Sequence, residues 1–234
     1  MRKMLSVLVA IGTALTIASP GVAQAHRGRH HPIERPVHFE ATVQYLDGTS
    51  RAMTGDRGQI TAIAADSLTL VRPDNVEVTL GLSNTTCYHV DGLPSTWDQL
   101  AVGDRVATLA EASSTGGLFA TSVRAGVPLF LPGQPGCGLF HGAFHADQTN
   151  LFVDGTTSAW SRDKGRITAI APRLIRIHRP DGANVIAAVD AHTAVRGVRS
   201  YRALNLGEPV WIISLKVNGD PSDLLALLIR RIRR

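Results

Sequence analysis

The chain has 234 residues, of which 44% are hydrophobic and 18% are charged, and its formal net charge is +5. This apolar content is sufficient for a folded core and excludes a disordered, charge-rich tail protein. The two cysteines are too few for a zinc site built from cysteines.

The first 25 residues have the layout of a secretory signal. Arg2 and Lys3 form a basic start, an apolar run covers residues 5–18, and Ala23-Gln24-Ala25 is a small-residue cleavage site. The run is shorter than the roughly 20 residues of a membrane-spanning helix. We therefore predict cleavage near Ala25 and a secreted or extracytoplasmic location, at the cell surface, in the periplasm or in the medium.

Residues 26–36 form a polar segment rich in histidine and arginine, which we expect to be flexible. Histidines gather near this segment and again after the middle of the chain: His26, His30, His31, His38, His141 and His145. His141 and His145 have the spacing that shares a metal ion on a helix, but the glycines around them favour an extended segment. We expect surface histidines, with a weak transition-metal site as the alternative.

An internal repeat sets the architecture of the chain. Residues 47–90 match residues 154–197 at 16 of 44 positions, without gaps and at an offset of 107. Both copies keep an Arg-Pro-Asp turn, followed by Asn75 in one copy and Gly182 in the other. Asn and Gly accept a left-handed backbone, so each turn is predicted to connect the two strands of a hairpin.

The residues on either side of these turns alternate between apolar and polar types, which is the pattern of β-strands. Apolar and polar residues alternate over residues 76–82, as expected for a half-buried strand. Residues 95–100 and 200–204 are predicted to form one short helical turn or an ordered loop in each copy. Gly58 and Gly165 also survive in both copies, and we interpret them, like the Arg-Pro-Asp turns, as residues that mark turns between strands.

These patterns predict an all-β protein of two tandem units related by internal duplication, each a small OB-like β-barrel or sandwich of five to six short strands. The predicted organisation is a signal at 1–25, a flexible segment at 26–36, a first repeat at 37–125, a Pro/Gly-rich linker at 126–139 and a basic second repeat at 140–234.

The order GDRGQITAI, SLTLVRPDN, VTLGLSNTT, LAVGDRVATLAE and LFATSVRAG resembles secreted bacterial β-domains catalogued as domain of unknown function 5666. The resemblance covers residues 55–125 well and residues 162–230 more loosely. It implies a small OB-like β-barrel and an exported location, and it brings no catalytic residues. The second copy departs from the pattern at Pro172 and at Glu208-Pro209, so a distorted or specialised second barrel is expected.

Cys87 and Cys137 are the only cysteines. Disulfides persist in oxidising compartments, so export favours a bridge between them over two separately buried thiols. Such a bridge would connect the first repeat to the linker and contribute about 3 to 4 kcal/mol.

Two pairs of acidic residues occupy equivalent positions in the repeats: Asp56 with Asp163, and Asp74 with Asp181. We expect turn and capping roles for them, because nothing in the sequence brings the members of a pair together. The chain contains none of the common motifs for a nucleophile, a zinc protease or a nucleotide. We therefore predict a protein that is not an enzyme and has no cofactor, with an unrecognised active site as an alternative.

Charge is divided unevenly between the halves. Residues 26–139 have a net charge of −3 and residues 140–234 a net charge of +6. The arginines of the second half predict a site for a polyanion, because guanidinium groups bind phosphate and carboxylate through paired hydrogen bonds. The candidate residues are Arg173, Arg176, Arg179, Arg230, Arg231, Arg233 and Arg234. The alternative is an ordinary solvated basic face.

Aromatic residues make up only 5% of the chain, which argues against a stacking surface for nucleic acid. Trp160, Tyr201 and Trp211 are the aromatic candidates in the second repeat, and Trp211 is expected in the core. We predict an exported binding or structural module whose partner is an anionic cell-wall polymer or an envelope protein, with only transient contact to a membrane surface. The alternative is a weak metal-binding protein.

Overall fold

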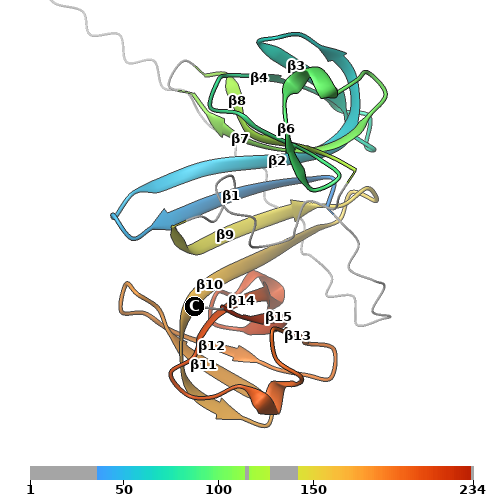
Figure 1. Ribbon diagram of the computed structural model, residues 1–234. Coiled ribbons are helices and arrows are strands. Elements are labelled where there is room, and N and C mark those ends of the chain that lie inside the picture. The colour runs from blue at the N-terminus through green and yellow to red at the C-terminus, as the bar shows by residue number, and fades with distance from the viewer. Residues whose placement is uncertain (1–35, 114–115, 127–141, 233–234) are drawn as a thin grey trace, which may run out of the picture.

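The computed structural model describes residues 36–113, 116–126 and 142–232. Of these residues 60% lie in strands and 5% in helices, so the fold is nearly all β. Two barrels lie at opposite ends of a central group of strands, which includes β1 and β9 (Figure 1). The predicted all-β fold with barrel units is therefore confirmed.

The first unit contains eight strands among its described residues. They are β1 (His38–Tyr45), β2 (Ser50–Ile63), β3 (Ser67–Val71), β4 (Glu77–Gly81), β5 (Cys87–Val90), β6 (Leu93–Ser95), β7 (Arg105–Ala112) and β8 (Leu118–Ala125). Strands β2, β3, β4, β8 and β7 pair in this order, and β7 pairs back to β2, so the five strands close a barrel. The β4–β8 pairing is parallel and the others are antiparallel.

The second unit repeats this arrangement. Its strands are β9 (Ala143–Leu151), β10 (Thr157–Ala171), β11 (Leu174–His178), β12 (Asn184–Ala188), β13 (Ala194–Arg196), β14 (Pro209–Lys216) and β15 (Leu224–Arg231). Strands β10, β11, β12, β15 and β14 close the second barrel, again with one parallel pairing, β12–β15. Pro172 and Glu208-Pro209 do not prevent this closure.

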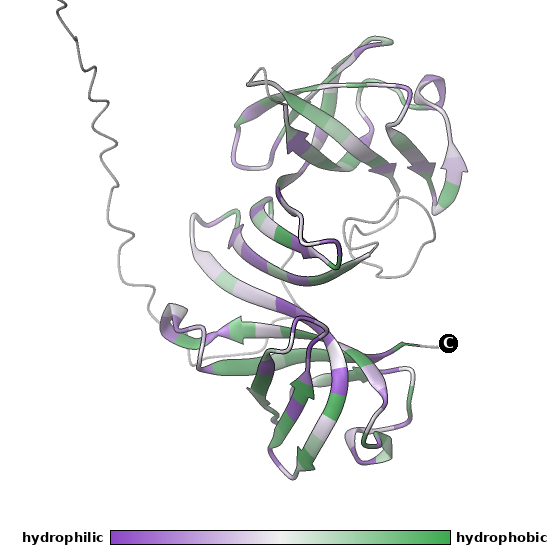
Figure 2. Ribbon diagram, turned by 90° about the vertical axis from the view of Figure 1, so that its left-hand side faces the viewer, coloured by the Kyte–Doolittle hydropathy of each residue, from purple (hydrophilic) through white to green (hydrophobic). Residues whose placement is uncertain are grey.

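The alternation of residue types explains the two barrel cores. Hydrophobic and hydrophilic residues succeed each other along the strands (Figure 2), and every second side chain points inward. The first core is built from Ile60, Leu68, Leu70, Leu80, Leu82, Leu100, Val106, Ala110, Ala120, Val123 and Ala125. The second is built from Ile167, Ile175, Ile177, Val185, Ala187, Val189, Leu204, Val210, Ile212, Leu224, Ala226 and Ile229.

The interpretation of Gly58 and Gly165 as turn residues was wrong. They lie within the long strands β2 and β10, where two backbones come close together. A Cβ atom on Gly58 would be 2.4 Å from the carbonyl oxygen of Val71, and one on Gly165 would be 2.6 Å from that of His178. Because contacts below 3.0 Å force a shift, only glycine fits at this crossing of the long strand over its neighbour.

The predicted hairpin turns are confirmed. Asn75 has φ 64° and Gly182 has φ 91°, the left-handed conformation that these residue types accept. The amide of Asn75 donates to the carbonyl of Arg72 at 3.0 Å, and the amide of Gly182 donates to that of Arg179 at 3.1 Å. The expected short helical turns are present as 3-10 turns, η1 (Trp97–Gln99) and η2 (Tyr201–Ala203), and a third, η3 (Val217–Gly219), precedes β15.

The two units are joined through equivalent strands. Strands β1 and β9 pair antiparallel, and Ala41 lies opposite Gln148, its own counterpart at an offset of 107. The pairing is therefore symmetric about this point, like an isologous dimer interface built within one chain. It produces a six-stranded antiparallel sheet in the order β7-β2-β1-β9-β10-β14.

A third apolar cluster lies on one face of this central sheet. It contains Phe39, Ala41, Val43, Met53, Leu109, Ala143 and Ala146, with Tyr45 and Trp211 packed against it. The sequence left open whether the two units pack together. The shared sheet and the third core show that they do.

No helix among the described residues is long and apolar enough to cross a membrane. The predicted signal at residues 1–25, the predicted flexible segment up to residue 35 and most of the predicted linker lie outside the described residues.

Candidate functional site: a duplicated network of histidine, aspartate and arginine

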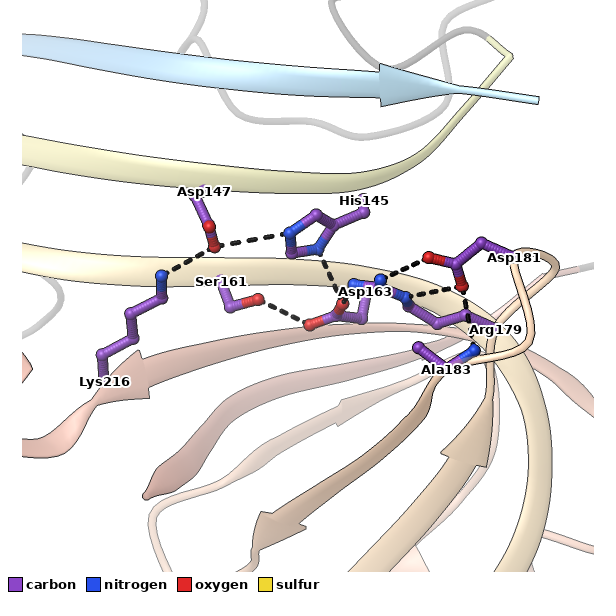
Figure 3. A network of polar contacts seen from close by, with 8 residues as sticks. All are labelled: His145, Asp147, Ser161, Asp163, Arg179, Asp181, Ala183 and Lys216. Atoms are coloured by element: carbon purple, nitrogen blue, oxygen red, sulfur yellow. Dashed lines mark hydrogen bonds and ion pairs between the residues drawn. The ribbon is translucent and has the colours of Figure 1, made fainter. Parts of the chain in front are cut away.

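A polar network lies where the long strand β10 leaves β9 and enters the second barrel (Figure 3). Asp163 on β10 is only 1% exposed, and His145 on β9 lies directly opposite it in the ladder. Their side chains share one face of the sheet, and Nδ1 of His145 is 2.8 Å from Oδ1 of Asp163. The network therefore starts from a cross-strand pair that the register creates.

Arg179 adds the hairpin turn to this pair. Its Nη1 donates to Oδ1 of Asp163 at 2.8 Å, while Nε and Nη2 donate to the two carboxylate oxygens of Asp181 at 3.1 and 2.5 Å. Oδ1 of Asp181 also accepts the amide of Ala183 at 3.2 Å. One guanidinium thus connects the turn after β11 to the buried carboxylate on β10, through a two-pronged and geometrically specific contact.

Three further side chains extend the network across the sheet (Figure 3). Ser161 donates to the second carboxylate oxygen of Asp163 at 2.6 Å. Nε2 of His145 lies 3.5 Å from Asp147, and Nζ of Lys216 on β14 lies 2.7 Å from the same carboxylate. The chain of contacts runs from β14 to the hairpin turn.

The first unit contains the same network at an offset of 107. Nδ1 of His38 is 2.8 Å from Oδ1 of Asp56, which also accepts Nη1 of Arg72 at 3.1 Å. Arg72 in turn donates from Nε to Asp74 at 2.9 Å. Each of the four residues of the core network is conserved in type between the units.

The two networks differ at their outer end. Glu40 takes the place of Asp147 and lies 3.8 Å from Nε2 of His38. Thr54 takes the place of Ser161, and its buried hydroxyl has no hydrogen-bond partner. The second network is therefore the more completely connected one.

The pKa shifts follow from these contacts. Burial raises the pKa of Asp163, but the hydrogen bonds from His145, Ser161 and Arg179 outweigh this effect, so the net shift is downward. Burial lowers the pKa of His145, yet its two carboxylate partners raise it to about 9. The hydrogen bond from His145, with a further one from Lys216, lowers the pKa of Asp147 to about 2. At neutral pH the second network consists of three carboxylates and three cations.

This geometry suits a structural clamp better than acid–base chemistry. His145 is protonated at neutral pH and both of its nitrogens face carboxylates, so it offers no free base. The hydroxyl of Ser161 donates to a carboxylate and not to an imidazole, which is the opposite of an activated nucleophile. The arrangement instead holds the hairpin turn against the long strand in each unit.

One expectation about the acidic residues was wrong. Asp56 and Asp163 lie within long strands and are buried, so they have no turn or capping role. Asp74 and Asp181 do lie at turns. The sequence contained a signal for the network, because His38 and His145 are also separated by 107 positions, just outside the segment over which the copies were aligned.

The predicted arginines do not form one face. Arg173 and Arg176 are exposed, whereas Arg179 turns inward to Asp163 and Asp181. Arg230 is half-buried on β15, which β12 separates from β11 in the barrel. Arg231 is paired with Glu208 at 3.3 Å. The inclusion of Arg179 in an open basic site is therefore corrected, and Arg233 and Arg234 lie outside the described residues.

The aromatic candidates are also placed. Trp160 is 9% exposed, and the hydroxyl of Tyr201 donates to the carbonyl of Leu174 at 2.6 Å, so both are structural. Trp211 is half-buried and packs against the third core, which places it at the edge of the core and not fully within it.

The structure describes only some of the residues in the metal and disulfide predictions. Among the described residues, no three histidine, cysteine or acidic side chains are grouped to hold a metal ion. His145 lies on an extended strand, as expected, while His26, His30, His31 and His141 lie outside the described residues. Cys87 is half-buried on β5 and is disulfide-bonded, as predicted. Cys137, the other cysteine of the sequence, lies outside the described residues.

No protein-family model matches the chain, and no curated protein matches it. The site is therefore interpreted from its own geometry.

Proposed function

We propose that this protein is an exported binding module, without enzymatic activity, that contacts an anionic polymer of the cell envelope through its second unit. The proposal includes the export signal and the membership of the domain family that the sequence resembles. The sequence predicted a polyanion site from the net charge of the second half. The proposal adds which basic side chains of the second unit are available to the polymer.

The observation that carries the proposal is the distribution of unpaired cations. Among the described residues, the first unit has 5 basic and 10 acidic side chains, and the second has 12 basic and 8 acidic ones. Within residues 142–232, no carboxylate lies within ion-pair distance of Arg173, Arg176, Arg196 or Arg230. Cations that no described carboxylate neutralises are available to an anionic polymer.

The clamps support this function indirectly. They neutralise the buried carboxylates of Asp56 and Asp163 and fix the hairpin turns, so the surrounding strands present their outer side chains from a rigid frame. Because the histidines and the serine of the networks are engaged in this role, the best-connected polar site offers no chemistry that would favour an enzyme.

Cosedimentation of the exported protein with purified cell-wall polymer, over a series of salt concentrations, tests the proposal. Binding that weakens steeply as salt increases is expected, because released counterions and screened charges reduce the attraction. No binding at low salt, or binding that salt leaves unchanged, would contradict it.

A further inference from the structure

A row of four side chains crosses the outside of the second barrel. Arg196 on β13 is paired with Arg230 on β15, Arg230 with Trp211 on β14, and Trp211 with Lys164 on β10. Directly paired residues project from the same face of a sheet, so these four side chains lie side by side. Neighbouring strands are about 4.8 Å apart, which gives the row a length of about 14 Å.

The row is accessible from solvent. Arg196 is exposed, and Arg230, Trp211 and Lys164 are half-buried. No ion pair with a described carboxylate neutralises Arg196, Arg230 or Lys164. Two like charges at directly paired positions are destabilising, so the free protein holds Arg196 beside Arg230 at a cost that an anionic ligand would remove.

The equivalent row of the first unit also contains basic residue types. There His89 is paired with Arg124, Arg124 with Ala107, and Ala107 with Arg57. Three of the four positions therefore carry basic residues in both units, and Trp211 replaces the small Ala107. We refer to Arg196, Arg230, Trp211 and Lys164 as the cationic row.

The two rows differ in accessibility. In the first unit His89, Arg124 and Ala107 are 6%, 9% and 5% exposed. Arg57 in the first row is half-buried, as is Lys164 in the second. The cationic row of the second unit has an arginine in the place of His89, is more exposed at Arg196, Arg230 and Trp211 than the first row is at the equivalent positions, and gains an indole between its cations. This contrast distinguishes it from a basic face that arises only from composition.

We propose that the cationic row is the site that binds the polymer, and that its ligand is a linear chain with repeated phosphate groups. The paired guanidiniums of Arg196 and Arg230 bind one phosphate together, Lys164 binds the next anionic group, and Trp211 contacts the part of the chain between them. This inference rests on the proposed function, because it assigns that function a position and a ligand class.

Long-chain inorganic polyphosphate is the probe, titrated into the exported protein at several salt concentrations. The test variant is Arg196→Gln/Arg230→Gln. The matched control is Arg199→Gln/Arg202→Gln, which removes two exposed arginines of the same unit that lie outside the cationic row, just before and within η2. A third variant, Arg196→Lys/Arg230→Lys, keeps the charge but loses the planar guanidinium groups that bind phosphate through paired hydrogen bonds. Thermal unfolding shows whether each variant is folded.

The row variant is expected to bind at least about tenfold more weakly and to reduce the slope of log affinity against log salt by about 1, for the one phosphate that the two arginines bind together. The control should change affinity by less than about threefold, and the lysine variant should fall between them, as expected for partial retention of charge. Binding should also change the fluorescence of the wild type, and Trp211→Phe should remove most of that change while Trp97 and Trp160 remain.

Four outcomes would overturn the inference. Equal losses of affinity in the row variant and the control would mean that the polymer binds a diffuse basic surface. The inference would then fail, while the proposed function would stand. Binding to poly-glutamate but not to polyphosphate would reject the phosphate class. A dimer of the wild type that the row variant abolishes would show that the row binds the acidic first unit of a second copy. If the wild type binds neither polyphosphate nor cell-wall polymer, the proposed function fails together with the inference.

Discussion

His145 lies directly opposite Asp163 in the β9–β10 ladder, and its Nδ1 is 2.8 Å from the carboxylate. The same relationship joins His38 to Asp56 in the β1–β2 ladder. In both units the aspartate also accepts a hydrogen bond from the arginine of the hairpin turn. The duplicated unit therefore includes an electrostatic clamp as well as a fold.

The clamp should contribute measurably to stability. Asp163→Asn removes the charge that Arg179 and His145 share, leaving two cations beside each other in a largely buried place. We expect the free energy of unfolding to fall by about 2 to 4 kcal/mol, the range for breaking a buried ion pair or a charged hydrogen bond. Denaturant unfolding measures the change.

Asp223→Asn is the control for this variant, because Asp223 is exposed and contributes only its backbone to the described hydrogen bonds. A loss in the control equal to that of Asp163→Asn would show that the clamp adds nothing beyond removal of an acidic residue.

The stability should depend on pH through His145. The pKa of this residue rises from 6.5 to about 9 on folding, so the folded state holds the proton more tightly. Its stabilisation is fully present below pH 6.5, declines as the pH rises through 9, and is then lost. The difference in unfolding free energy between the wild type and His145→Gln should therefore shrink over this range.

Unfolding curves at a series of pH values measure this dependence, and His178→Gln, at an exposed histidine, provides the comparison. A difference that stays constant from neutral to alkaline pH would mean that protonation of His145 does not support the fold.

Replacing either retained glycine by alanine, the residue with the smallest side chain, should destabilise the fold. Gly58→Ala and Gly165→Ala place a Cβ atom 2.4 and 2.6 Å from a backbone oxygen, and the backbone has little freedom to yield. We expect each variant to lose about 1 to 3 kcal/mol of stability, as overpacked sites do. Thermal unfolding measures this loss.

Gly117→Ala offers the matched comparison, since its nearest atom would be 3.7 Å away, an ordinary contact. If Gly117→Ala is as destabilising as the other two, close approach of the backbone is not the reason for glycine at positions 58 and 165.

The shared central sheet should make the two units unfold together. Val43 is fully buried in the third core, at the point where β1 pairs with β9. Val43→Ala should reduce stability by about 2 kcal/mol, for two lost methyl groups and the cavity that remains. Because the sheet continues through both units, calorimetry should show a single transition that moves as a whole.

Thr42→Ala, on the exposed face of the same strand, should have little effect. Two separate transitions, of which Val43→Ala shifts only one, would show that the β1–β9 pairing does not couple the units.

The sequence by itself determined the local structure of this protein. The Arg-Pro-Asp turns, the alternation in the strands around them and the two barrel units follow from residue types whose backbone preferences act over a few positions. The repeat at an offset of 107 also indicated that the two units share one strand arrangement.

Only the tertiary structure decided which distant residues meet. Alternation shows that a side chain faces the core or the solvent, but not which strand lies beside its own, so the His145–Asp163 pair and the inward turn of Arg179 were not evident. The β1–β9 pairing was likewise open, because either strand had a free edge that any compatible edge could occupy. Arg196 and Arg230 are more than thirty positions apart in the sequence. The closure of the barrel and the register of β13 against β15 place them side by side.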